Sequence, residues 1–333
     1  MLVVSIGCPA GIGPEVSVAG AARVRGIPRI LVGDQETILE AADRVGVPRR
    51  KFAPLGSALG DTKKIRIHAV GPSLRASDRD PGRPSRVSGA VQLLWLDAAY
   101  ELVRGGRGRA LVTAPVNKAA IARSGAPGAR EFKGHTEWLE AQEQARRAVM
   151  CFAAPTLTTS LVTTHLALRD VPKALSADKV QAATCELARL LRALGKPKPR
   201  LVVCSLNPHA GEDELFGDEE KRAIVPGMQL ARSALGRRAL VEGLLGAETA
   251  FRKAAGGAYD GVVAMYHDQA TIPMKLVAFG SAVNVTMGLR IVRTSVDHGT
   301  GYDIAWQGRA DPSGMVAALE LAARLLRAGP RAR

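Results

Sequence analysis

The first fifteen residues, MLVVSIGCPAGIGPE (Met1–Glu15), join an apolar run to a glycine-rich turn and the start of a helix. Leu2–Ile6 is largely apolar, which is typical of a strand covered on both faces of a parallel sheet. Gly7–Glu15 follows it; glycine permits close backbone approach, and a helix N-terminus attracts anions. The segment has neither the Gly-Lys-Ser/Thr of a Walker loop nor the glycine order of the Rossmann fingerprint. A tight structural turn and a ligand-binding loop both remain open.

The alternation of strand and helix continues along the chain, and it predicts an α/β protein with mainly parallel sheets. Further strands are expected at Arg29–Val32, Ile65–Val70, Ala110–Thr113, Ala148–Ala153, Leu157–Thr163, Arg200–Ser205 and Gly261–Met265. Helices are expected at Val87–Val103, Thr136–Arg147, Asp178–Leu194, Glu219–Leu235 and Ser313–Ala328. A polar segment, Gly71–Arg86, is predicted to be a mobile loop.

The length of 333 residues suits two domains of ordinary size. The glycine-rich stretch at Gly125–Gly134 interrupts the pattern and marks a crossing to the second domain. A return is expected near Gly280–Gly288. We therefore predict a discontinuous first domain, 1–128 plus 285–333, and a second domain, 129–284.

The composition restricts the class of partner. The net charge is +15, but the arginines are scattered and aromatic residues make up only 4%, so we expect no nucleic-acid partner. A positive field would instead attract anionic substrates and cofactors. Neither a membrane span nor a signal peptide is expected, and the four cysteines form no C-x-x-C pair. A cytoplasmic protein without membrane attachment is predicted.

Five of the six histidines occur in short polar segments that follow strand-like runs, and only His68 does not. His165, His209 and His267 each come at or just after the end of an apolar run. Three imidazoles brought together would bind Zn, Mn, Co or Ni and leave a position for substrate. Spacing alone is equally compatible with three unrelated histidines in separate loops.

Other polar residues near these segments suit an anionic substrate. Lys275 and Arg293 lie in largely apolar neighbourhoods, and each can hold a phosphate or carboxylate. Asn284 lies between two valines, and His135-Thr136 opens a helix whose first N–H groups can hold an oxyanion. Lys118, where a strand passes into a helix, either lines the site or lies on the surface.

Six motifs, in this order, make the sequence resemble the 4-hydroxythreonine-4-phosphate dehydrogenase family of pyridoxal phosphate biosynthesis. They are Thr113–Lys118 (TAPVNK), Gly134–Glu137 (GHTE), Thr163–Pro172 (TTHLALRDVP), Ser205–Glu212 (SLNPHAGE), Ala264–Gln269 (AMYHDQ) and Arg293–Thr300 (RTSVDHGT). The resemblance runs nearly end to end, from Gly7 to Asp303. It implies a two-domain fold like that of isocitrate and isopropylmalate dehydrogenases, with a cleft between the domains. The first domain would face the cofactor, and the second the metal, the substrate and the dimer partner.

The resemblance also implies roles for particular residues. His165, His209 and His267 match divalent-metal ligands (Zn, Mg, Co or Mn), and His267 is expected from the partner subunit of a homodimer. The substrate-binding positions matched are His135, Thr136, Lys275, Asn284 and Arg293. NAD or NADP would bind near Gly288, Asp297, His298 and Gly299. Lys275 and His209 are the candidate catalytic residues.

The implied substrate, 4-phosphohydroxy-L-threonine, carries a hydroxyl on the carbon β to its carboxylate. A metal ion that holds this hydroxyl would lower its pKa as hydride leaves for NAD. The product, 2-amino-3-oxo-4-phosphooxybutanoate, is a β-keto acid that would decarboxylate to 3-amino-2-oxopropyl phosphate. Lys275 or a metal-bound water would act as the general base.

Some positions depart from the family pattern. Cys8 stands where an acidic residue is usual, Asp213-Glu214 replace a common Gly-Gly pair, Glu248 replaces Asp, and Arg290 replaces proline. These departures leave open a relative that oxidises threonate or erythronate 4-phosphate, or a dihydrodiol carboxylate. A metal-dependent hydrolase and a non-catalytic metabolite-binding protein also stay open as hypotheses from other functional classes.

Overall fold

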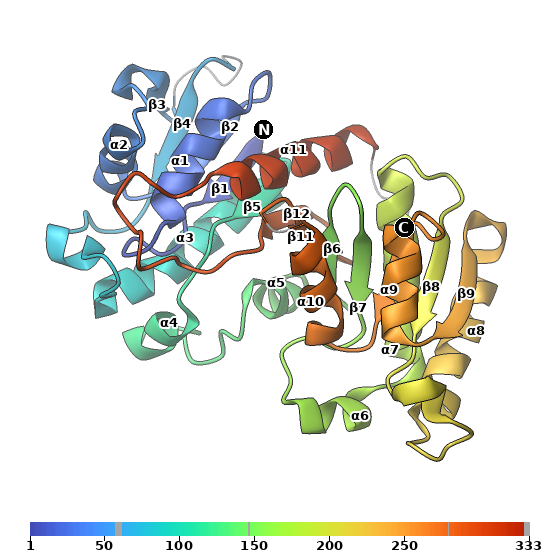
Figure 1. The fold of residues 1–333 in the computed structure, drawn as a ribbon. Coiled ribbons are helices and arrows are strands. Elements are labelled where there is room, and N and C mark those ends of the chain that lie inside the picture. The colour runs from blue at the N-terminus through green and yellow to red at the C-terminus, as the bar shows by residue number, and fades with distance from the viewer. Residues whose placement is uncertain (57–61, 146, 279, 330–333) are drawn as a thin grey trace. The chain divides into compact units, whose positions relative to one another are not determined.

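The computed structural model describes residues 1–56, 62–145, 147–278 and 280–329. The chain forms two compact units, shown as ribbons in Figure 1. Unit 1 comprises Met1–Gln144 and Leu289–Arg333, and unit 2 comprises Ala145–Gly288. Unit 1 is therefore discontinuous in sequence, since the chain leaves it and later returns.

The first strand, β1 (Leu2–Ser5), lies inside the sheet of unit 1. It pairs in parallel with β2 (Arg29–Gly33) on one side and β5 (Ala110–Thr113) on the other. All four of its residues are buried, which explains why the sequence is a largely apolar run rather than an alternating one. The strand order is β3-β4-β2-β1-β5-β12, and each of these pairs is parallel. The remaining strands are β3 (Phe52–Pro54), β4 (Ile65–Ala69) and β12 (Val292–Val296).

The helices of unit 1 begin where the sequence supplies capping side chains. Asp34 accepts a hydrogen bond from the Thr37 amide at the start of α2, and Ser85 accepts one from the Ser88 amide at the start of α3. Helix α3 packs against β1, and α11 packs against β5 and β12. The helices are α1 (Gly13–Arg23), α2 (Gln35–Arg44), α3 (Arg86–Arg104), α4 (Lys118–Ser124), α5 (His135–Glu143) and α11 (Ser313–Arg327), with short 3-10 turns η1 (Arg49–Lys51) and η2 (Ala76–Arg79).

The sheet of unit 2 mixes strand directions. Its order is β11-β6-β7-β10-β8-β9, and β6 (Val149–Ala153) is antiparallel to both of its neighbours. From β7 onward the pairs are parallel. The strands are β7 (Thr158–Leu161), β8 (Arg200–Cys204), β9 (Leu240–Leu245), β10 (Gly261–Ala264) and β11 (Val283–Met287). The carboxyl ends of parallel neighbours meet at one edge of a sheet, so the segments that follow β7, β10 and β8 emerge together.

Helices and short turns surround this second sheet. A core that includes Phe152, Leu161, Val202, Val262 and Met274 forms between the strands and the helices packed on them. The helices are α6 (Val171–Ala174), α7 (Ala177–Ala193), α8 (Val225–Leu235), α9 (Ala247–Ala255) and α10 (His267–Ala278). The turns are η3 (Leu168–Asp170), η4 (Pro208–Gly211), the π-helical η5 (Glu220–Ile224) and η6 (Gly236–Arg238).

The predicted α/β class with mainly parallel sheets is confirmed, and β5 spans Ala110–Thr113 as expected. The unit boundaries differ from the predicted 1–128 plus 285–333 and 129–284. Residues 129–144 lie in unit 1, where Trp138 donates a hydrogen bond to Asp97 of α3. Among the described residues, no helix combines the length and the apolar character needed to cross a bilayer.

Candidate functional site

Arg293 is the most deeply buried charge among the predicted site residues. It lies in β12, next to Leu111 of β5 in the sheet register, and is 2% exposed. Its Nη2 donates a 2.7 Å hydrogen bond to Thr113 Oγ1 at the end of β5. Burial lowers the pKa of Arg293 to about 10, and nearby Glu137 opposes that change. The guanidinium therefore stays charged at neutral pH and can attract an anion.

His135 starts α5 and lies near Arg293 in unit 1. Burial lowers the pKa of His135 well below its ordinary value, and the positive charges of Arg293 and Lys118 lower it further. Its ring packs edge-on against Phe132, with centroids 5.9 Å apart. Among the described residues, His135 Nε2 has no hydrogen-bond partner. Unit 1 thus places a neutral imidazole beside two cations, an arrangement that can accept an anionic group and hydrogen-bond it.

Two further residues of this set occupy defined positions. Thr136 is buried in the first turn of α5, and the N-terminus of a helix attracts anions. Lys118 is the first residue of α4, and the Asn117 side chain caps this helix by accepting from the Ala120 amide at 2.8 Å. The structure therefore brings His135, Arg293 and Lys118 within electrostatic reach of one another.

The first loop of the chain lies against the loop that follows β12. The Ile12 amide donates to the Thr300 carbonyl at 2.9 Å, and a Cβ on Gly11 would lie 2.6 Å from that same oxygen. The Gly11 position therefore has no room for a side chain. His298 Nδ1 lies 3.0 Å from its neighbour's carbonyl, that of Gly299. The predicted cofactor residues Asp297, His298 and Gly299 directly follow β12.

Tyr302 is a polar residue of this region for which no sequence motif predicted a role. Its hydroxyl accepts a 2.6 Å hydrogen bond from Asn117 Nδ2 and lies 3.5 Å from the Cys8 sulfur. Burial, aided by Cys8, raises the pKa of Tyr302 to about 12, so the phenol stays protonated. Cys8 is thus a buried contact of Tyr302.

In unit 2, His165 and His267 lie side by side. Their ring centroids are 5.8 Å apart, with 39° between the ring planes. They follow β7 and β10, whose parallel pairing brings these two segments together. His267 Nδ1 forms a 2.6 Å contact with Asp268 Oδ1, which orients the ring and directs Nε2 away from that carboxylate.

His209 follows β8, which pairs with β10. No group of three or more His, Cys, Asp or Glu residues in the described part of the chain is placed to hold a metal ion. His209 lies in η4 with φ of 51°, inside an unusual left-handed segment. Imidazole nitrogens bind a metal ion at about 2.0–2.1 Å, and with ring centroids 5.8 Å apart His165 and His267 are close enough to bind one ion together. The predicted triad draws its ligands from two subunits, and the described residues of one chain bring two of the three histidines side by side.

The other predicted residues of unit 2 are placed as follows. Lys275 is exposed near the end of α10, and Asn284 is half-buried in β11 opposite Phe152. Gly288 has φ of +85°, and a Cβ there would lie 2.3 Å from the Arg147 carbonyl oxygen. Glycine is therefore needed at position 288 because the positive φ and the close carbonyl oxygen leave no room for a side chain. This requirement is independent of the role near the cofactor that we predict for Gly288.

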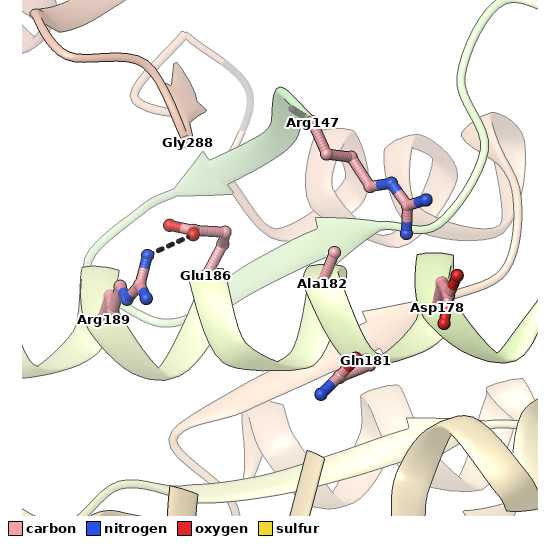
Figure 2. Close-up of a pocket in the computed structure, with 7 residues that line it drawn as sticks. All are labelled: Arg147, Asp178, Gln181, Ala182, Glu186, Arg189 and Gly288. Atoms are coloured by element: carbon pink, nitrogen blue, oxygen red, sulfur yellow. Dashed lines mark hydrogen bonds and ion pairs between the residues drawn. The ribbon is translucent and has the colours of Figure 1, made fainter. Parts of the chain in front are cut away.

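A pocket of unit 2 lies over α7 (Figure 2). Glu186 of this helix pairs with Arg189 at 2.6 Å, and Arg147 lies across from Ala182. The lining residues are Arg147, Asp178, Gln181, Ala182, Glu186, Arg189 and Gly288. The lining contains Gly288 but none of the three predicted metal ligands, so this pocket is separate from the paired histidines.

Known proteins resemble the chain over nearly its full length. The model of the family described as "Pyridoxal phosphate biosynthetic protein PdxA" matches residues 27–322. A 4-hydroxythreonine-4-phosphate dehydrogenase of Xanthobacter autotrophicus is 40% identical, over 99% of this chain and 95% of that protein. A D-threonate 4-phosphate dehydrogenase of Salmonella typhimurium is 36% identical, over 97% of this chain and 98% of that protein.

A solved structure agrees with the sequence relatives. The 4-hydroxythreonine-4-phosphate dehydrogenase of Klebsiella pneumoniae superposes with a TM-score of 0.80 at 34% identity, covering 98% of this chain and 99% of that one. This match is consistent with the expected isocitrate and isopropylmalate dehydrogenase-like fold. The relatives are dehydrogenases, so the chain is an oxidoreductase. It belongs to the PdxA family of pyridoxal phosphate biosynthetic proteins.

Proposed function

We propose that this enzyme oxidises 4-phosphohydroxy-L-threonine with NAD, or NADP, in pyridoxal 5'-phosphate biosynthesis. The product, 2-amino-3-oxo-4-phosphooxybutanoate, would then decarboxylate to 3-amino-2-oxopropyl phosphate. The observation that carries this proposal is the pairing of half-buried His135 with buried Arg293, within the family match over residues 27–322. A phosphorylated hydroxy acid is an anion, and this pair is suited to bind one.

Residues of unit 1 would bind and orient the substrate. Arg293, fixed by Thr113, offers its guanidinium to a carboxylate or phosphate. His135 is neutral, so its imidazole can donate or accept one hydrogen bond without adding charge. Thr136 lies in the first turn of α5, next to His135, and backbone N–H groups at the start of a helix can hold an oxyanion. Lys275 and Asn284 of unit 2 are the further substrate contacts that we propose, with Lys275 as a candidate general base.

His165, His209 and His267 are the proposed ligands of one divalent cation, Zn, Mg, Co or Mn. When bound, such a cation would supply Lewis acidity toward a substrate oxygen. The 5.8 Å separation of the His165 and His267 rings supports two of these assignments. His209, which we also propose as a catalytic residue, would complete the set once a second subunit is present.

We further propose a homodimer with the metal site at the subunit interface. Helix α10 begins at His267 and carries three exposed apolar side chains, Ile272, Leu276 and Val277, at 60%, 81% and 47% exposure. An apolar face of this kind favours burial against a partner. The family resemblance supplies the proposal of NAD near Gly288, Asp297, His298 and Gly299. Free thiols at Cys8, Cys151, Cys185 and Cys204 suit the proposed cytoplasmic location.

The choice of substrate has one specific rival. The Salmonella typhimurium relative named D-threonate 4-phosphate dehydrogenase is nearly as similar as the relatives named for 4-hydroxythreonine 4-phosphate. The two acids differ at the carbon next to the carboxylate, where one carries an amine and the other a hydroxyl. D-Threonate 4-phosphate is therefore the second candidate substrate.

Steady-state NADH formation, followed by its absorbance, tests the proposal. Purified enzyme would be assayed with Zn²⁺, Mg²⁺, Co²⁺ or Mn²⁺ and with 4-phosphohydroxy-L-threonine, the 4-phosphates of D-threonate and D-erythronate, or a dihydrodiol carboxylate. The highest kcat/KM is expected for 4-phosphohydroxy-L-threonine. A much higher value for another acid would reject that substrate assignment. Release of inorganic phosphate without NADH would instead identify a hydrolase.

A further inference from the structure

Glu15 is a buried carboxylate in the first turn of α1, and the residue is 0% exposed. Each of its two oxygens accepts one backbone hydrogen bond. Oε2 accepts from the Trp306 amide at 2.6 Å, and Oε1 accepts from the Gly308 amide at 2.7 Å. Both amides belong to residues 297–312, which connect β12 to α11. The carboxylate therefore ties the start of α1 to this connecting segment at two points.

The backbone of the connecting segment is unusual where Glu15 contacts it. Trp306 has φ of 60°, in the left-handed region, although it is not glycine. Such a conformation persists only where the surrounding structure determines it. Two contacts restrain it here: the Trp306 amide donates to Glu15, and Trp306 Nε1 donates to the Pro9 carbonyl at 2.8 Å. Without the carboxylate, one of these restraints on the turn at Trp306 is lost.

The same segment begins with three of the residues that we propose near the cofactor, Asp297, His298 and Gly299. They follow the carboxyl end of a strand in a parallel sheet, which is where ligands bind in α/β folds. Among the residues that the structure describes, none hydrogen-bonds His298 Nε2, a buried ring nitrogen. Gly299 next to it is exposed, and a Cβ there would meet no atom within 4 Å. A buried nitrogen of this kind, beside open space, fits a bound polar group.

The start of α1 holds the segment at both ends of a short stretch. The Ile12 amide donates to the carbonyl of Thr300, the residue after Gly299, at 2.9 Å. Glu15, in the same turn of chain as Ile12, holds Trp306 and Gly308. Release of these two amides would therefore give Thr300, and the cofactor residues before it, more conformational freedom.

We propose that Glu15 is a positioning residue that holds residues 297–308 in the conformation that binds the nicotinamide cofactor. This inference rests on the proposed function, since it needs NAD or NADP at residues 297–299. A hydrogen bond to a charged group changes an equilibrium constant by about 10- to 100-fold. Loss of the carboxylate should lower the fraction of the enzyme that is competent to bind the cofactor, and the apparent Kd rises as that fraction falls.

The test is the affinity of the purified enzyme for NADH and for NADPH, measured by the fluorescence of the bound dinucleotide. In Glu15→Gln the side-chain amide would set an N–H against one of the two backbone N–H groups, so Kd should rise by about 10- to 100-fold. The KM for the dinucleotide should rise more than the KM for the phosphorylated substrate. Hydrogen–deuterium exchange should become faster in peptides that cover residues 297–308.

Glu15→Asp is the second variant, and it decides the question if Glu15→Gln does not fold. Aspartate keeps the charge but is one methylene shorter, so it cannot reach both backbone amides unless the segment shifts. It should raise Kd in the same direction as Glu15→Gln. Thermal unfolding shows which variants remain folded.

Glu220→Gln is the matched control. Glu220 is 5% exposed, and its carboxylate also accepts two backbone hydrogen bonds, from the amides of Leu206 and Asn207 at 2.9 and 2.8 Å, but it lies in unit 2. This variant should bind the dinucleotide like the wild type, even where it lowers the stability of the protein.

The outcomes separate the inference from the proposed function. If every folded Glu15 variant binds the dinucleotide as tightly as the wild type, the positioning role is wrong and the proposed function stands. The same conclusion follows if Glu220→Gln weakens binding as much as Glu15→Gln does. If the wild type binds neither NADH nor NADPH, the proposed use of NAD or NADP fails, and the inference fails with it.

Discussion

Arg293 is a buried charge that we propose as a substrate contact, and a conservative replacement tests that role. Its guanidinium is 2% exposed and donates to Thr113. Lysine at this position would keep a positive charge but lose the planar fork that contacts a carboxylate or phosphate through two nitrogens. We expect Arg293→Lys to raise KM for the phosphorylated substrate by about 10- to 100-fold, because hydrogen bonds to charged groups contribute about 1.5–3 kcal/mol.

Steady-state kinetics at saturating cofactor would measure this effect. Arg290→Lys, three residues earlier in the chain, is a control with the same chemical change at a site that we do not assign to the substrate. A KM in Arg293→Lys equal to that of the wild type would show that the guanidinium does not contact substrate.

His135 makes a prediction about stability and pH. Burial, then Arg293 and Lys118, lower the pKa of His135 in the folded chain, whereas the unfolded pKa is about 6.5. A group with a depressed folded pKa contributes its stability above the unfolded pKa. That contribution is lost as the pH falls from about 6.5 through the folded pKa, because unfolding then takes up a proton. The loss has a limiting slope of about 1.4 kcal/mol per pH unit.

Urea unfolding at pH 5.5 and pH 7.5 checks this prediction, with His135→Asn as the comparison. The wild type should lose more free energy of unfolding at the lower pH than the variant does. Equal pH dependence in the two proteins would mean that His135 is not buried in its neutral form. His68→Asn provides a second comparison, since burial and Arg107 also lower the pKa of that histidine.

Particular residues show why the candidate site could be predicted only in part. His165, His209 and His267 were identifiable because each follows an apolar run that becomes a strand. The distances between these three histidines could not be predicted, because they depend on strand order and on contacts between side chains far apart in sequence. Glu15 was visible within the first fifteen residues, but its partner Trp306 lies 291 residues away. No local pattern could therefore reveal this contact.

At the scale of elements, the loop after β8 adopts an unusual backbone. The six residues His209–Glu214 all have positive φ, and only Gly211 among them is glycine. Asp213 and Glu214 have φ of 52° and 73°. Non-glycine residues in the left-handed region cost roughly 1–2 kcal/mol each. This loop therefore stores strain beside a proposed metal ligand.

Asp213→Gly should consequently stabilise the protein by about 1 kcal/mol, since glycine adopts this conformation without the steric cost. Thermal or urea unfolding of the apoprotein measures the change. Asp170→Gly is the matched control, because Asp170 has φ of −96° and no side-chain capping bond. Glycine there should destabilise the protein through the greater freedom of the unfolded chain. If Asp213→Gly destabilised the protein as much as the control does, this result would contradict a left-handed backbone at Asp213.

Sequence patterns predicted some elements closely and missed others for identifiable reasons. The boundaries of β5 agree with the prediction because its apolar run is bounded by polar residues on both sides. Helix α5 ends at Glu143 rather than Arg147, since Gln144 is left-handed with φ of 46°. The antiparallel direction of β6 was not predictable, because a buried run has the same composition in either direction. Strand β9 was missed because most of its residues are only half-buried.

For the whole molecule, the central question is which chains supply the metal ligands. One chain pairs His165 with His267 at 5.8 Å, and its described residues hold no third ligand of that pair. The family resemblance places His267 on the partner subunit instead. In both arrangements of a homodimer, the His209 and the His267 of one metal site come from different subunits. A closed two-fold dimer contains two such sites. Mixed dimers can therefore test the shared site.

Co-expression of differently tagged His209→Ala and His267→Ala chains, followed by purification of the mixed dimer, provides this test. Each variant alone should be inactive, whereas the mixed dimer should recover roughly half of the wild-type activity, because one of its two sites keeps all three ligands. No recovery would place all three ligands in one chain. A second mixture, His165→Ala with His267→Ala, then distinguishes the two divisions. Recovered activity in this second mixture would mean that His267 comes from the partner subunit. If no activity is recovered, His267 binds the metal together with His165 of its own chain, as the separation of their rings favours.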